Sequence, residues 1–201
     1  MTSPIEPGMT INRIHIIGGT GSGKTTLAHD LATVLKATAY ALDLVAYENA
    51  SGSKRSLSQR QMDIAHIVST PRWITEGAFL WWVDDLLEAA DVIIWLDIPW
   101  SLALWRVVTR HFKLSWAGTN RHPGLIRLLG FLRWAYRFYV DTDIKSPVSS
   151  DDDGAINRAT MAHHLSPYTS KLIRCQTPAE VAALLDTLKA DLRHTGPSGG
   201  L

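Results

Sequence analysis

The residues best suited to chemistry form one short run, Gly-Gly-Thr-Gly-Ser-Gly-Lys-Thr, between an apolar segment and a helical pattern. The spacing G-x-x-x-x-G-K-T, placed between a strand and a helix, is typical of a phosphate-binding loop. Its glycines let backbone N–H groups approach phosphate oxygens, and the start of the following helix adds a positive dipole end. The predicted nucleotide-binding residues are Gly18, Gly19, Thr20, Gly21, Ser22, Gly23, Lys24, Thr25 and Thr26. This loop predicts a site for a nucleoside triphosphate.

Two side chains of the loop have specific expected roles. Lys24 is expected to reach the β- and γ-phosphates, and the Thr25 hydroxyl is expected to bind Mg²⁺, which normally keeps several waters. A dinucleotide fingerprint is excluded, because Lys24 stands where its third glycine would be. The loop therefore predicts a triphosphate bound together with magnesium.

Three acidic residues follow predicted strands, at the place where ligands bind in open α/β sheets. They are Asp43, Glu76 and Asp97. We predict Asp97 to be a magnesium ligand, the alternative being a cap of the helix that begins near Pro99. Asp43 fits the ligand crevice and a turn or helix cap equally well.

Short apolar runs alternate with longer helical patterns along the chain, which predicts a parallel sheet with crossover helices. The predicted strands are 14–17, 39–42, 73–75, 92–96 and 170–175. The predicted helices are 26–36, one that starts at a capping box of Ser58 and Gln61 and ends near 69, 79–90, 99–112, 124–140 and 178–193. We expect an α/β protein with a three-layer α/β/α P-loop NTPase fold, built on a central parallel sheet of about five strands. Its domain would span 11–194, with disordered tails at 1–10 and 195–201.

Basic residues are concentrated in one region, although the net charge of the chain is only +1. Seven Lys or Arg residues and no Asp or Glu lie between positions 106 and 137. They are Arg106, Arg110, Lys113, Arg121, Arg127, Arg133 and Arg137. A region of one sign favours an anionic ligand, and a nucleotide is the first candidate. For any single arginine the alternative is a solvated basic helix side. We predict a small helical or loop lid over about 106–140.

The composition excludes several other classes of protein. A hydrophobic fraction of 46% and a charged fraction of 19% are those of a soluble globular protein. No apolar run is long enough for a membrane span, and the start of the chain lacks the apolar core of a signal peptide. The single Cys175 excludes an internal disulfide and a cysteine-based zinc cluster. We expect a cytoplasmic protein in which Cys175 is buried.

These motifs together resemble those of the nucleoside monophosphate kinase-like P-loop proteins, of which adenylate kinase is the best known. Besides the loop, the resemblance rests on Leu96-Asp97-Ile98-Pro99 and on Arg106 and Arg110, spaced as Arg-x-x-x-Arg. Within this group the chain is most similar to the bacterial DNA topology modulation proteins. That similarity is carried by Trp73-Ile74-Thr75-Glu76-Gly77, Trp95-Leu96-Asp97, Leu104-Trp105-Arg106 and Arg133-Trp134, and it covers about 14–188.

The resemblance implies that Mg-ATP binds to the loop and that a lid closes over it. The implied catalytic cations are Lys24, Arg106, Arg110 and Arg121, and the implied acceptor-binding residues are Asp43, Glu76, Arg133 and Arg137. Either Asp43 or Glu76 would orient the acceptor hydroxyl or the magnesium. Adenylate kinases carry Asp-Gly-Phe-Pro-Arg where residues 76–80 are Glu-Gly-Ala-Phe-Leu, so the arginine that grips the acceptor phosphate is missing.

Two functions therefore compete. The first is a kinase that transfers the γ-phosphate of Mg-ATP to a small-molecule acceptor such as a nucleotide or nucleoside. The alternative is a non-catalytic or weakly ATP-hydrolysing switch that binds DNA or an anionic surface through the basic region at 106–137. The cation spacing relative to the phosphate loop favours the kinase.

Overall fold

A computed structural model of the chain describes residues 10–48, 52–120 and 124–194. Its five-stranded sheet has the order β2-β3-β1-β4-β5, and every neighbouring pair is parallel. The strands are β1 (Arg13–Gly18), β2 (Thr38–Ala41), β3 (Trp73–Gly77), β4 (Val92–Leu96) and β5 (Leu172–Cys175). All five predicted strands are present, each within two residues of its expected ends.

The register of the sheet brings the candidate functional residues to one edge. Ile17 of β1 lies opposite Gly77 of β3, and Gly18 lies opposite Leu96 of β4. The phosphate loop after β1, the acid Glu76 and the acid Asp97 therefore meet at the carboxyl edge of three adjacent strands.

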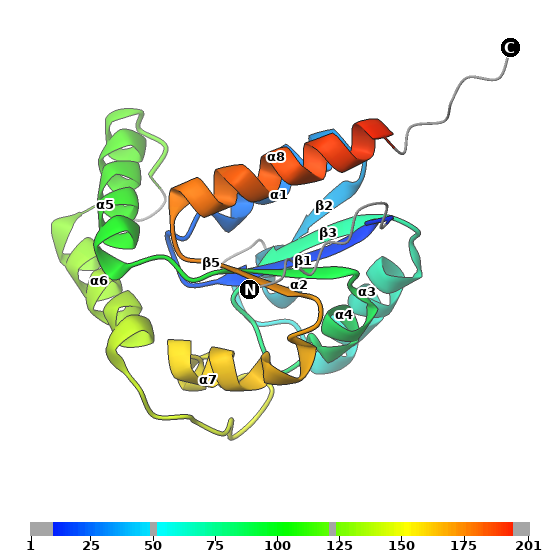
Figure 1. Ribbon diagram of the computed structural model, residues 1–201. Coiled ribbons are helices and arrows are strands. Elements are labelled where there is room, and N and C mark those ends of the chain that lie inside the picture. Colours follow the sequence, from blue (N-terminus) through cyan, green and yellow to red (C-terminus); the bar gives the residue numbers. More distant parts are fainter. Residues whose placement is uncertain (1–9, 49–51, 121–123, 195–201) are drawn as a thin grey trace, which may run out of the picture.

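Helices cover both faces of the sheet, which confirms the three-layer fold (Figure 1). On one face, α1 (Lys24–Leu35) and α8 (Pro178–His194) pack against apolar side chains of β1, β3 and β4. The other face is covered by α3 (Leu57–Ser69), α4 (Asp84–Ala89) and α7 (Arg158–His164), together with the short α2 (Leu42–Ala46). Cys175 is buried, as expected.

Two helices stand apart from these layers, beside the sheet edge that carries the loop (Figure 1). They are α5 (Trp100–Trp116) and α6 (Leu125–Val140), and they fall in the predicted lid region. Helix α5 continues four residues beyond the expected end at 112. Short 3₁₀ turns at Asp153–Ala155 (η2) and Ser166–Tyr168 (η3) flank α7.

Two local predictions are wrong. The capping box of α3 is made by Ser56 and Gln59, because the Ser56 hydroxyl accepts from the Gln59 N–H while the Gln59 side chain accepts from the Ser56 N–H. The expected helix at 79–90 begins only at Asp84. Phe79 to Val83 are buried or half-buried in succession, a pattern that a helix lying on a core does not give.

Among the described residues, no helix is both long enough and apolar enough to cross a membrane. The expected tails at 1–10 and 195–201 lie, except for Thr10, outside the part of the chain that the structure describes.

Candidate functional site

The phosphate loop has the conformation that its glycines predict. Gly21 and Gly23 adopt φ angles of +77° and +100°, which disfavour any side chain. A Cβ on Gly21 would lie 2.7 Å from the carbonyl oxygen of Ala103 in α5. Glycine is therefore required at this position both for the turn and for the close approach of α5.

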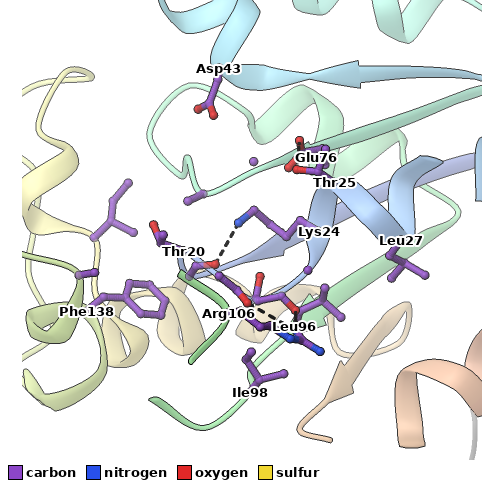
Figure 2. Close-up of a pocket in the computed structure, with 18 of the residues that line it drawn as sticks. Thr20, Lys24, Thr25, Leu27, Asp43, Glu76, Leu96, Ile98, Arg106 and Phe138 are labelled. Atoms are coloured by element: carbon purple, nitrogen blue, oxygen red, sulfur yellow. Dashed lines mark hydrogen bonds between the residues drawn. The ribbon is translucent and has the colours of Figure 1, made fainter. Parts of the chain in front are cut away.

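Lys24 lies across the loop, at the start of α1 (Figure 2). Its Nζ donates to the carbonyl of Gly19 at 3.0 Å. Desolvation lowers the pKa of Lys24, the carboxylates Glu76 and Asp43 oppose that shift, and Arg110 adds to it. The lysine charge therefore interacts with acids that follow two strands and with Arg110 of α5.

Thr25 and Glu76 form a pair beside the lysine. The Thr25 hydroxyl donates to Oε1 of the nearly buried Glu76 at 2.9 Å. A hydroxyl and a carboxylate are oxygen ligands of the kind that Mg²⁺ prefers, either directly or through water. The donor set at this position fits magnesium, although no cluster of three or more His, Cys, Asp or Glu that could hold a metal occurs among the described residues.

The prediction for Asp97 needs correction, because its carboxylate is already engaged. Arg158 at the start of α7 donates to both of its oxygens at 2.6 and 2.8 Å, and Nε of Arg174 in β5 donates to Oδ2 at 2.8 Å. The side chain of Asp97 is fully buried and does not line the cavity that contains the loop. Arg174 also lies over the Trp95 ring, 4.4 Å from its centroid. Asp97 thus joins β4, β5 and α7, and neither a magnesium role nor the alternative helix cap fits.

Arg106, on α5, contacts the phosphate loop. Its Nη1 donates to the carbonyl of Ser22 at 2.7 Å. Arg110, one turn further along α5, also lines the cavity. Helix α6 reaches the loop as well, because the Tyr139 hydroxyl donates to the carbonyl of Thr20 at 3.3 Å. Arg121 lies outside the described residues.

The two arginines expected together on α6 are separated in the structure. Arg137 lines the cavity, near Phe138 and Trp134. Arg133 is exposed and is not among the cavity-lining residues. The expectation that both face a bound ligand is therefore wrong for Arg133.

One cavity of about 990 Å³ joins the loop to a second group of side chains beyond Lys24. In Figure 2, Lys24 lies between Asp43 on one side and Arg106 on the other. Asp43 lines the cavity and stands in the first turn of α2. It is not the cap of that helix, which is Ala41. Desolvation raises the pKa of Asp43, Lys24 opposes this shift, and Asp153 reinforces it.

The far wall of the cavity carries further polar groups. The Tyr47 hydroxyl donates to Oδ2 of Asp153 at 2.8 Å, and Nζ of Lys54 pairs with the same oxygen at 2.8 Å. Desolvation and the hydrogen bond to Asp153 raise the pKa of Tyr47. Lys145, which also lines the cavity, is paired with Asp141. This wall therefore presents carboxylates and a phenol, and its charged residues Asp141, Lys145 and Asp153 already have partners.

Sequence reasoning missed several residues that shape the site. Arg158 and Arg174 belong to no recognisable sequence motif. Arg174, however, lies within the otherwise apolar segment 172–175, and an arginine in such a segment indicates that a buried acid lies nearby. Asp153 is the last of three consecutive aspartates, a pattern typical of a solvated helix start. Tyr47 gave no signal, because it follows a helix of only five residues.

Comparison with known proteins supports the fold. No known family model matches the chain. It is similar to the uncharacterised protein YqaC of Bacillus subtilis strain 168, with 30% identity over 101 residues, which is 50% of this chain and 57% of that protein. The matched part thus spans little more than half of the length of this curated relative.

Among solved structures, the chain is similar to shikimate kinase from Acinetobacter baumannii in complex with shikimate. The TM-score is 0.50 and the identity 14%, with 92% of this chain and 96% of that chain covered. A gluconokinase from Sinorhizobium meliloti 1021 aligns with a TM-score of 0.46 and 14% identity over 91% of this chain and 92% of that chain. At such low identity, the similarity to shikimate kinase shows the fold alone, which is that of the P-loop kinases.

Proposed function

We propose that this protein is a phosphotransferase that moves the γ-phosphate of Mg-ATP to a hydroxyl group of a small molecule. The observation that carries the proposal is the single cavity on both sides of Lys24. A phosphate loop lies at one end and a desolvated carboxylate, Asp43, lies at the other. A protein that only bound or hydrolysed ATP would need no second compartment beyond the γ-phosphate position.

ATP would occupy the part of the cavity formed by the loop, α5 and α8. The backbone N–H groups of the loop and Lys24 would bind the phosphates, and Lys24 would exchange its bond to the Gly19 carbonyl for a phosphate oxygen. The apolar side chains of Val181 and Leu185 on α8 line the same end and suit the nucleoside part. Thr25 and Glu76 would hold the magnesium, which would neutralise phosphate charge when bound.

The acceptor would occupy the part of the cavity beyond Lys24. We assign Asp43 to the acceptor hydroxyl, because Glu76 is already paired with Thr25 at the magnesium position. In the transfer, the acceptor oxygen bonds to the γ-phosphorus and the bond to the β-phosphate oxygen breaks. ADP leaves, and Asp43 takes the hydroxyl proton, a role that its raised pKa favours.

The charges around the acceptor compartment favour a neutral or cationic hydroxylated acceptor over one with its own phosphate. Asp43 lines it without an ion-pair partner among the described residues, while Asp153 is paired with Lys54 and Lys145 with Asp141. A second phosphate would meet these carboxylates with Arg137 as the main remaining cation. Within the nucleoside monophosphate kinase-like and topology modulation group that the motifs resemble, this favours a nucleoside-like or sugar-like acceptor over a nucleotide.

The lid arginines would act during transfer. Arg106 is fixed on the loop by its bond to Ser22, and Arg110 lies close enough to Lys24 to lower the lysine pKa. Cations placed in this way stabilise the charge on the moving phosphoryl group, and a closed lid keeps water from accepting it. Arg121 remains a further candidate from the sequence.

The proposal is tested by incubating the protein with γ-labelled Mg-ATP and separate pools of nucleosides, nucleoside monophosphates, sugars and amino sugars. We expect label on an acceptor without a phosphate, and none with Lys24→Ala. The matched control is Lys189→Ala, which removes a lysine of α8 outside the cavity lining and should leave transfer unchanged. ATP binding without transfer to any pool would favour the nucleotide-switched regulator instead.

A further inference from the structure

The hairpin of α5 and α6 exposes large apolar side chains on its outer side. On α5 these are Trp105, Phe112 and Trp116, and on α6 they are Ile126, Leu129, Tyr136 and Val140. Trp116 is 95% exposed and Ile126 is 88% exposed. We call these seven residues the outer stripe. Large exposed apolar side chains that gather on a folded protein generally mark an interaction site.

The outer stripe is distinct from the face of the hairpin that lines the cavity. At 100° per residue, Trp105, Phe112 and Trp116 lie on one narrow side of α5, opposite the buried Ala103 and Val107. Arg106 and Arg110 project from another side of the same helix, toward the loop.

The same separation holds on α6. The stripe residues of this helix lie on the side away from the buried Leu128 and Ala135. Phe131 and Trp134, which line the cavity, are on a different side and are not counted in the stripe. Arg137, which also lines the cavity, projects from α6 between these two sides, so a partner on the outer stripe would leave Phe131 and Trp134 free.

The charged side chains of the two helices that carry the stripe have one sign. No Asp or Glu occurs anywhere from position 100 to position 140. Arg133 falls within the stripe of α6, and Lys113 and Arg127 are exposed nearby in the chain. The surface therefore combines apolar and aromatic side chains with cations.

We propose that the outer stripe docks the protein on the surface of an anionic membrane. An amphipathic helical surface with Trp and Tyr on its apolar side and Lys or Arg beside it lies in the bilayer interface, where acyl chains receive the rings and acidic headgroups pair with the cations. The helices would lie on the bilayer, consistent with the lack of a helix able to span it among the described residues.

Other occupants fit the surface less well. A second copy would bring two surfaces of the same positive sign together, which is repulsive. A nucleic acid would satisfy the cations but would leave the large aliphatic and indole side chains exposed, because phosphates offer them no apolar contact.

The test is co-sedimentation of the full chain with vesicles of phosphatidylcholine alone or of equal parts phosphatidylcholine and phosphatidylglycerol. We expect binding to the anionic vesicles only, weakened by salt. The variant Trp105→Ser, Phe112→Ser, Trp116→Ser should bind about ten- to a hundredfold more weakly, because it loses the apolar area that enters the interface.

The matched control is Leu44→Ser, Met62→Ser, Val148→Ser, which removes three exposed apolar side chains from other parts of the surface. It should bind vesicles as the wild type does. The ATP affinity of both variants, measured without vesicles, should be unchanged, which shows that they fold.

Four results would each overturn the proposal. The first three are no binding to anionic vesicles, equal binding to neutral vesicles, and an equal loss of vesicle binding in both triple variants. The fourth is a wild-type protein that self-associates and binds no vesicles, together with a stripe variant that no longer self-associates. Binding to duplex DNA that is insensitive to the stripe variant, in the absence of vesicle binding, would assign the basic region to nucleic acid.

Discussion

The substitution Asp97→Asn separates a structural role of this acid from a role in binding magnesium. The carboxylate of Asp97 is fully buried and accepts hydrogen bonds from Arg158 and Arg174. Asparagine keeps the volume but removes the charge and places an amide N–H₂ group against one guanidinium. We therefore expect the variant to lose stability without losing affinity for Mg-ATP.

The size of this loss follows from the burial of the three side chains. Removing one partner of a fully buried ion pair costs about 3–5 kcal/mol. The side chains of Arg158 and Arg174, however, are 39% and 45% exposed, so both can regain water in the variant. This exposure reduces the expected loss to about 2–3 kcal/mol. For a domain of this size, such a loss lowers Tm by about 4–12 °C.

The assay combines thermal unfolding with titration of a fluorescent ATP analogue at varied magnesium concentration. The comparison variant is Glu76→Gln, which we expect to weaken the magnesium dependence while changing Tm much less. The structural role of Asp97 is refuted if Asp97→Asn unfolds at the wild-type temperature yet its ATP affinity no longer depends on magnesium.

Three further predictions test the loop, the sheet and the cavity. Gly21→Ala places a Cβ close to the Ala103 carbonyl at a positive φ, so calorimetry should show a loss of about 1–3 kcal/mol and titration a weaker affinity for ATP. Burial lowers the pKa of His15 to about 3, so protonation opposes folding; relative to His15→Asn, the wild type should lose about 1.4 kcal/mol of stability per pH unit as pH falls from 6.5 toward 3 in denaturant titrations. The raised pKa of Asp43 means that its ionised form opposes folding above the ordinary aspartate pKa; Asp43→Asn should therefore raise Tm at neutral pH, and a gain that persisted below about pH 4 would contradict this assignment.

The sheet and the phosphate loop were predictable because their signals are local. A glycine-rich turn between an apolar strand and a helix fixes its own geometry, and the apolar run at 92–96 could hardly be anything but a central strand. The α3 cap was misplaced by two residues because Ser56 and Ser58 both precede a glutamine at the required spacing. Local pattern alone does not choose between them.

The roles of the acids were not predictable from local pattern. Asp97 occupies the strand end where a magnesium ligand is expected, but its environment is set by Arg158 and Arg174, which lie 61 and 77 residues away in the sequence. Asp153 reaches the cavity through a hydrogen bond to Tyr47, 106 residues away. Such contacts depend on how the strands and helices pack. Sequence spacing could therefore name the candidate acids but could not assign one role to each.

The most direct test of the proposed phosphotransfer is the rate at which label from Mg-ATP reaches an acceptor in the Asp43→Asn variant, measured beside its affinity for ATP. If Asp43 accepts the hydroxyl proton in a compartment separate from the nucleotide, transfer should fall by about 10²–10⁴-fold while ATP affinity is unchanged. Transfer at the wild-type rate, or a parallel loss of ATP binding, would contradict the proposal.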